Sequence, residues 1–226
     1  MIQATFSLPS APTRSNLLAR AAIALSVTFL ALLALLHFLE PEFDPSWRMI
    51  SEYELGRSGW LMTIAFFAWG GSVLTLTTAV SPSLNTTGGT VGHWWMLLIG
   101  VALFAAGIFE PYPITNPSPT VTSTLHNLSG VIVIMTFPIA ASLVARSLAR
   151  HPNWKSASRP LLWVTLLAWF GMVVFFASIP VSNIINPGAG RVGPQVFVGW
   201  PNRFLVLAYQ LWLIFVGQKA ASIAKR

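Results

Sequence analysis

The residues of this sequence that could do chemistry are a few carboxylates, histidines and arginines next to long apolar segments. Glu110 ends one apolar segment and His126 opens the next, with fifteen residues between them. A carboxylate beside an imidazole can act as a general acid and base, or form half of a metal site. Because antiparallel neighbouring helices bring the two ends of such a connection together, we expect these side chains to lie close to each other. Glu110 and His126 are therefore the candidate catalytic residues, and a purely structural contact is the alternative.

A second group of polar residues near this pair could bind a substrate. Arg57 and Arg203 could hold an anionic headgroup, because a guanidinium binds phosphate through two parallel hydrogen bonds. Arginines at a membrane edge also extend toward lipid phosphates without forming a specific site. The sequence gives little support for a serine nucleophile, since no G-x-S-x-G pattern is present around Ser51. The remaining candidates for substrate binding are Ser51, Glu52, Tyr53 and His37.

The sequence predicts no metal and no cofactor. It has no cysteine and no H-E-x-x-H motif, and no two of its histidines are four residues apart. Histidine and carboxylate side chains could still converge on a zinc ion from different helices, which spacing along the chain does not reveal.

Six apolar segments must position these residues. Hydrophobic residues make up 54% of the chain and charged residues 8%, which is too little charge to cover a water-facing surface. Each segment is close to the roughly 20 residues that cross a bilayer, where the backbone must pair its own N–H and C=O groups. The sequence therefore predicts an all-α integral membrane protein, a six-helix bundle forming a single domain over residues 1–226. The expected helices are at about 17–39, 58–80, 93–110, 125–145, 160–179 and 202–221.

The distribution of charge predicts how the bundle is oriented. Alternate connections place nine of the thirteen Lys and Arg residues on one side and all six acidic residues on the other. Because cytoplasmic loops collect Lys and Arg, we expect both termini to be cytoplasmic, in the cell inner (plasma) membrane. This also explains the net charge of +7 without nucleic acid. Membrane lipids are the expected partners, and the sequence predicts no particular protein partner.

The helix ends and helix centres carry two further signals. The stretches "FLEPEFDP", "IFEPYPITNP" and "SIPVSNIINP" have their first prolines at 41, 111 and 180. This spacing is consistent with three helical hairpins in weak internal repetition, although prolines also commonly end helices. Gly70 and Gly71 lie in the middle of the second apolar segment, where we expect a neighbouring helix to approach closely. The segment centres carry no ionisable residue, which argues against ion-coupled transport.

The stretch "SEYELGRSGWLMTIAFFAWGGSVL" resembles the domain-of-unknown-function family DUF998. Members of this family look like S-x-Y-x-L-G-x-x-G-W-L-M-x-x-A-F at the second helix. The stretches "GIFEPYP", "TLHNLSG" and "NRFLVLAYQLW" are similar to later parts of the family pattern and contain Glu110, His126 and Arg203. The resemblance implies a small multi-pass membrane protein of bacteria or archaea, and it supplies no reaction.

Three functions are compatible with these observations. The first is binding of a lipid headgroup or small amphiphile at a polar Glu/His/Arg site on the extracytoplasmic rim. The second is a membrane-embedded hydrolase or lipid-modifying enzyme acting at the outer leaflet. The third is a non-catalytic sensor or partner-binding module. The sequence leaves open whether the protein is an enzyme.

Overall fold

The computed structural model describes residues 13–188, 190 and 193–224, and these form an all-helical bundle without strands. Its six long helices are each long and apolar enough to cross a membrane, which confirms the predicted fold class. The long helices are α1 (Arg14–Leu39), α2 (Gly59–Val80), α3 (Thr87–Ile108), α4 (Val121–Arg150), α5 (Ser158–Ile185) and α6 (Gly199–Ile223). Three short 3₁₀ helices lie between them: η1 (Ile50–Leu55), η2 (Ser81–Ser83) and η3 (Pro152–Ala157).

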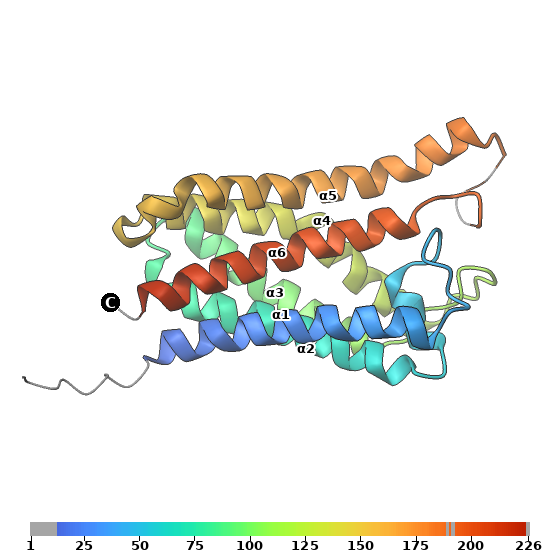
Figure 1. Cartoon of the computed structure of the whole chain (residues 1–226), viewed down its shortest axis with the longest axis horizontal. Coiled ribbons are helices and arrows are strands. Elements are labelled where there is room, and N and C mark those ends of the chain that lie inside the picture. Colours follow the sequence, from blue (N-terminus) through green and yellow to red (C-terminus); the bar gives the residue numbers. More distant parts are fainter. Residues whose placement is uncertain (1–12, 189, 191–192, 225–226) are drawn as a thin grey trace, which may run out of the picture.

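The six helices form a closed ring. Figure 1 shows them running side by side along the bundle. Each helix packs against the next one along the chain, and α1 packs against α6 to complete the ring. The contact between α4 and α5 is the least extensive of the six. The C-terminal turns of α5, which contain Pro180, run away from the other helices in Figure 1. The described parts of the chain do not test the proposed internal repetition, which remains a prediction.

Among the six helices, α3 and α4 begin furthest before their predicted starts, because polar residues cap them. α3 begins at Thr87 instead of about 93, and the Thr86 hydroxyl accepts a hydrogen bond from the N–H of Gly89 at 3.0 Å. α4 begins at Val121 instead of about 125, and the Thr120 hydroxyl accepts a hydrogen bond from the N–H of Ser123 at 3.1 Å. These caps supply partners for N–H groups that a helix start leaves unpaired, so the helices extend into stretches that are typical of loops.

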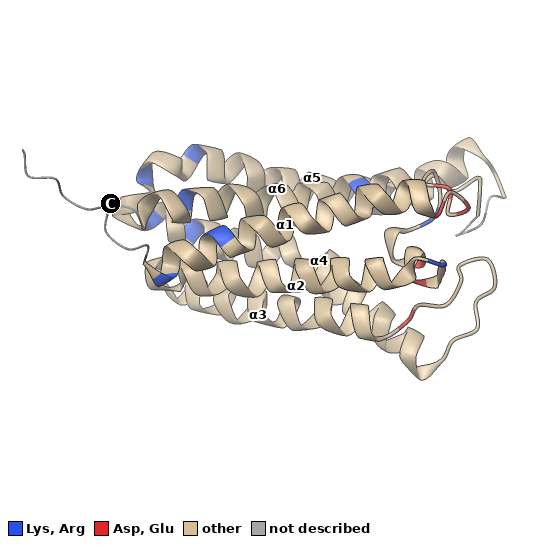
Figure 2. Cartoon of the chain, turned by 60° about the horizontal axis from the view of Figure 1, so that its bottom comes forward, with Lys and Arg blue, Asp and Glu red and all other residues tan. Residues whose placement is uncertain are grey.

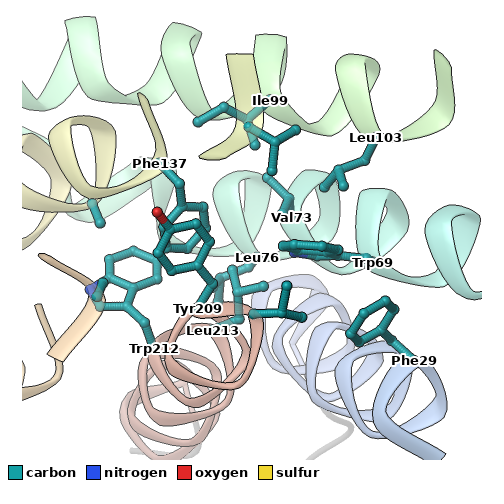
Figure 3. Packing of buried hydrophobic residues seen from close by; sticks show 14 of the residues in the cluster. Phe29, Trp69, Val73, Leu76, Ile99, Leu103, Phe137, Tyr209, Trp212 and Leu213 are labelled. Atoms are coloured by element: carbon teal, nitrogen blue, oxygen red, sulfur yellow. The ribbon is translucent and has the colours of Figure 1, made fainter. Parts of the chain in front are cut away.

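Aromatic side chains fill the core between α4 and α6, and Figure 3 shows the main ones. Phe137 stacks on Tyr209 with ring centroids 4.3 Å apart, and Trp212 meets Phe137 edge-on at 5.7 Å. Pro138 has no N–H, so it cannot pair with the carbonyl of Ile134 one turn earlier. The Tyr209 hydroxyl donates a hydrogen bond to that carbonyl at 2.7 Å. α6 therefore satisfies the backbone group that the proline leaves free in α4.

Gly70 is a point of close approach between α2 and α3. A Cβ added at Gly70 would lie 3.0 Å from the carbonyl oxygen of Gly100 and 2.8 Å from the ring of Phe104. A Cβ added at Gly71 would meet one flexible side chain, Leu25, at 3.1 Å. The close packing expected at this glycine pair therefore involves mainly Gly70.

Charge divides the bundle into two ends, which Figure 2 shows directly. We call them the acidic end and the basic end. The acidic end carries Glu40, Glu42, Asp44, Glu52, Glu54 and Glu110. The basic end carries most of the described Lys and Arg residues: Arg14, Arg20, Arg146, Arg150, Lys155, Arg159 and Lys219. Which end faces the cytoplasm remains a prediction from the distribution of basic residues.

Candidate functional site

The connection between α1 and α2 folds over the acidic end and supplies much of the candidate site. Its 3₁₀ helix η1 has three residues per turn, so side chains three positions apart lie on the same face. Ser51 and Glu54 share one face, whereas Glu52 and Tyr53 point in two other directions. The short sequence "ISEYEL" can therefore make three different sets of contacts.

Arg203 connects this segment to α1 and α6. Its Nε donates to His37 Nε2 at 2.7 Å, and its remaining nitrogens donate to the carbonyl oxygens of Arg48 and Gly199 and to the Tyr53 hydroxyl at 2.7 to 3.1 Å. His37 Nδ1 lies 2.7 Å from the carbonyl oxygen of Leu33, which can only accept, so Nδ1 carries the proton and Nε2 accepts from Arg203. Four of the five guanidinium N–H groups are thus used within the protein.

Glu52 holds the same segment to the connection between α3 and α4. Its carboxylate makes a two-point contact with Arg48, at 2.9 and 3.0 Å. The same two oxygens accept from the backbone N–H groups of Met49 and Ile114, both at 3.1 Å. Glu52 is buried with its charge and its lone pairs matched, which indicates a structural role.

Glu40 plays a similar part at the start of α2. Its buried carboxylate accepts a hydrogen bond from the backbone N–H of Ser58, the residue before the helix. Burial raises the pKa of the Glu40 carboxyl, but this hydrogen bond and others to the charged form outweigh it and leave the pKa below its usual value. An anion at a helix N-terminus is favourable, so Glu40 anchors the end of α1 to the beginning of α2.

Glu54 is the carboxylate that lies against His126. One of its oxygens is 3.5 Å from His126 Nδ1, and both side chains are almost fully buried. Neither Glu54 oxygen has a hydrogen-bond partner among the described residues. His126 Nδ1 is also 2.9 Å from the carbonyl oxygen of Ala106 and 2.7 Å from that of Phe109. These carbonyls belong to the end of α3, where a helix leaves such groups unpaired, and they fix the imidazole in place.

The environment of Glu54 favours its neutral form. Burial, together with the nearby negative charge of Glu110, raises the pKa of the Glu54 carboxyl to about 8. The Thr63 hydroxyl, close to the carboxyl but outside hydrogen-bonding geometry, has a smaller opposite effect. An unpaired buried carboxyl is costly, and such strongly shifted groups are concentrated at functional sites. Among the three buried carboxyls of the acidic end, Glu54 therefore has the fewest hydrogen-bond partners.

Two adjoining cavities lie beside this pair. The smaller, of about 70 Å³, is inside the bundle and is lined by residues that include Trp69 and Leu103, both labelled in Figure 3. The larger, of about 330 Å³, lies between α4 and α5. Its lining includes Val131 and Met135, which are 51% and 48% exposed, so it opens on the outer face of the bundle. The two cavities share the lining residues Met49, Ser51, His126, Gly130 and Ile134.

We call the two cavities together the α4–α5 cleft. It is mostly apolar, and its few polar groups meet near η1. His126 Nε2, the Ser51 hydroxyl and the NH₂ group of Asn202 have no hydrogen-bond partner among the described residues, although all three residues line the smaller cavity. The Asn202 carbonyl oxygen accepts from the N–H of Ile50 at 3.0 Å, which leaves its NH₂ group available. An apolar pocket with a few convergent polar groups is typical of a ligand site.

The structure places the predicted site residues in three different settings. His126 and Ser51 border the cleft, whereas Arg203, His37, Tyr53 and Glu52 form the structural contacts described above. Glu110 and Arg57 have exposed side chains. The carboxylate found beside the His126 imidazole is Glu54, whereas the sequence predicts Glu110 at that position. The catalytic role of Glu110 with His126, and headgroup binding by Arg57 and Arg203, remain predictions.

Sequence reasoning missed Glu54 and Asn202 as members of the site. Glu54 is one of five acidic residues within fifteen positions, and no neighbouring residue distinguishes it from Glu42. The three-residue spacing of Ser51 and Glu54 was the available signal, but it has meaning only if this stretch forms a 3₁₀ helix. Among the described residues, no group of three or more His, Asp or Glu side chains could hold a metal ion.

The fold and the site together define a multi-pass α-helical membrane protein with a buried group of Glu, His and Arg side chains at one end. The chain belongs to the family described as "Protein of unknown function (DUF998)", whose model matches residues 21–219. Comparisons with curated proteins and with solved structures gave no match.

Proposed function

We propose that the protein binds a membrane lipid in the α4–α5 cleft, with an acyl chain between α4 and α5 and the polar part of the lipid at the acidic end. The observation that carries this proposal is the continuity of the cleft. Its lining runs from apolar side chains on the outer face of the bundle, such as Met135 and Phe176, to the polar groups of Ser51 and His126. An amphiphile has the same order of apolar and polar parts.

Gly130 supports the proposal from the side of α4. A Cβ added there would have no other atom within 4 Å, so this position faces open space within the bundle. A glycine in the middle of a helix costs roughly 1 kcal/mol relative to alanine. A glycine at this cost, next to space that no protein atom fills, is expected if a ligand occupies that space. The limited contact between α4 and α5 offers a lateral path from the bilayer.

Lipid binding can be tested by filling the cleft with a larger side chain at Gly130. In Gly130→Phe the added ring should occupy the lipid site without displacing protein atoms, so the protein should fold. We expect the affinity of purified Gly130→Phe for lipid to be at least about tenfold lower, which is a loss of about 1.4 kcal/mol of binding free energy. Native mass spectrometry during stepwise delipidation measures this retention.

The matched control is Val101→Phe, which adds a ring on the lipid-facing side of α3, where Val101 is 59% exposed. It should retain lipid like the unchanged protein. Equal retention by both variants would contradict the proposal. If a second protein copurifies by binding the polar connections, and no lipid is retained, the partner-binding function is favoured instead.

A further inference from the structure

We propose that Ser51 is a nucleophile that takes the acyl group from an ester-linked lipid bound in the α4–α5 cleft, with His126 as its general base. This inference rests on the proposed lipid binding and gives it a reaction class, acyl transfer or hydrolysis. The structural basis is a hydroxyl and an imidazole that border the same cavity of about 70 Å³. The carboxyl of Glu54 lies behind the imidazole.

His126 has the protonation pattern that a general base requires. The carbonyl oxygens of Ala106 and Phe109 can only accept, so the proton of the neutral imidazole is on Nδ1. Nε2 then carries a lone pair. No described residue donates to it, and His126 lines both parts of the cleft. The end of α3 therefore presents a free basic nitrogen to whatever the cleft contains.

Glu54 acts as a positioning residue through His126. When Nε2 takes a proton, the imidazole becomes a cation. Once Glu54 has ionised, its carboxylate lies 3.5 Å from Nδ1 and stabilises that cation. Glu110 is the other charged group that acts on Glu54, and its negative charge favours transfer of positive charge to His126. This arrangement of hydroxyl, imidazole and carboxyl has the order found in nucleophilic catalysis by serine.

The 3₁₀ helix explains how Ser51 and Glu54 can serve one imidazole. They lie three residues apart on the same face of η1, and Arg203, Asn202 and Glu52 hold η1 against α6 and the α3–α4 connection. The hydroxyl of Ser51 is half-buried and has no hydrogen-bond partner among the described residues. A rigid short helix thus replaces the strand-to-helix turn that presents serine in a G-x-S-x-G motif.

The reaction balances without a cofactor. The Ser51 hydroxyl proton moves to His126 Nε2 while Oγ forms a bond to the acyl carbon of the lipid ester. The bond between that carbon and the lipid alcohol oxygen breaks, and the departing oxygen takes the proton from Nε2. Water or a second alcohol then removes the acyl group by the same steps in reverse. The NH₂ group of Asn202 is the available donor for the negative charge that develops on the carbonyl oxygen.

A fluorophosphonate with a long alkyl chain tests the proposal, because an activated serine attacks its phosphorus, loses its proton, displaces fluoride and becomes phosphonylated. The purified protein is treated in detergent, and the modified residue is located by peptide mass spectrometry. We expect modification at Ser51, its loss in Ser51→Ala, and a rate at least about 100-fold lower in His126→Gln. Ser118→Ala, in the exposed α3–α4 connection, should react like the unchanged protein.

The dependence on pH separates catalysis from structural support. The rate should rise with pH as Glu54 ionises around its pKa of about 8, and Glu54→Gln should abolish this rise. If the unchanged protein binds lipid but Ser51 is not modified, the catalytic proposal is wrong and lipid binding stands. If Ser51 is modified at the same rate in His126→Gln, the role of His126 is wrong. If lipid is not bound either, both proposals fail.

Discussion

The Glu54 carboxyl lies 3.5 Å from the His126 imidazole, and both side chains are buried at the acidic end of the bundle. The two residues are brought together by separate elements, since Glu54 comes from η1 and His126 from the second turn of α4. Other buried carboxylates nearby, Glu40 and Glu52, are paired with backbone N–H groups or arginine. Glu54 alone among these three has no hydrogen-bond donor among the described residues. This contrast is the reason that we propose a functional role for Glu54 and a structural role for Glu40 and Glu52.

The raised pKa of Glu54 predicts that stability depends on pH in a defined window. Below the ordinary value of 4.5 both the folded and the unfolded chain carry the proton. Between 4.5 and about 8 the unfolded chain has lost it and the folded chain keeps it, so rising pH lowers the free energy of unfolding. The slope from this residue is up to about 1.4 kcal/mol per pH unit.

Glu54→Gln should remove this dependence, because an amide does not ionise. Thermal unfolding in detergent should show the variant more stable than the unchanged protein at about pH 9 and similar to it at about pH 4.5. Parallel curves for the two proteins across this range would show that Glu54 does not titrate in this window.

Arg203 should be essential for stability. Arg203→Gln would leave the Tyr53 hydroxyl, the Arg48 carbonyl and His37 without their donor in a buried place, at a cost on the order of 3 kcal/mol or more. Arg203→Lys should lose most of the same stability, because an ammonium group cannot reproduce the planar arrangement of N–H groups in a guanidinium. The control is Arg57→Gln on the exposed side of the same end, which should change stability by less than about 0.5 kcal/mol. Equal melting temperatures for the variants at 203 and 57 would contradict the structural role.

Gly70 and Gly71 offer a matched comparison within α2. Gly70→Leu should destabilise the bundle by overpacking, on the order of 1–3 kcal/mol, because the new side chain meets the backbone of Gly100. Gly71→Leu should cost less, since its neighbour is the flexible end of Leu25. Thermal unfolding of the two variants in the same detergent checks this order, and a larger loss for Gly71→Leu would show that the α2–α3 contact has been misplaced.

The orientation can be tested with single cysteines, because the chain has none of its own. Ser46→Cys at the acidic end should react with an impermeant thiol reagent in intact cells, and Ser156→Cys at the basic end should react only after the membrane is opened. The reverse pattern would place the acidic end and its site in the cytoplasm.

The sequence predicted the bundle well because its helices are set by long apolar segments. The starts of α3 and α4 were placed too far inward, since the caps at Thr86 and Thr120 lie in stretches rich in turn-forming residues. A cap depends on the backbone geometry of the residue itself, which composition does not reveal.

The candidate site was predicted only in part. His126 was recognised from its position at the start of a helix, and the structure places it at the cleft. Its carboxyl neighbour could not be chosen, because Glu54 is far from His126 along the chain and reaches it only when η1 folds over the acidic end. The sequence also could not predict that Arg203 makes its hydrogen bonds within the protein, because its partners come from α1, η1 and α6.

The most direct test of the central claim is to locate a bound lipid. A phospholipid with a photoreactive group in its acyl chain is incorporated into bilayers with the protein, and the crosslinked peptides are identified by mass spectrometry. Lipid binding in the α4–α5 cleft predicts crosslinks concentrated at Met135 and Phe176, and their loss in Gly130→Phe. Crosslinks spread equally over other lipid-facing positions, such as Val101 and Trp163, and unchanged in Gly130→Phe, would contradict it.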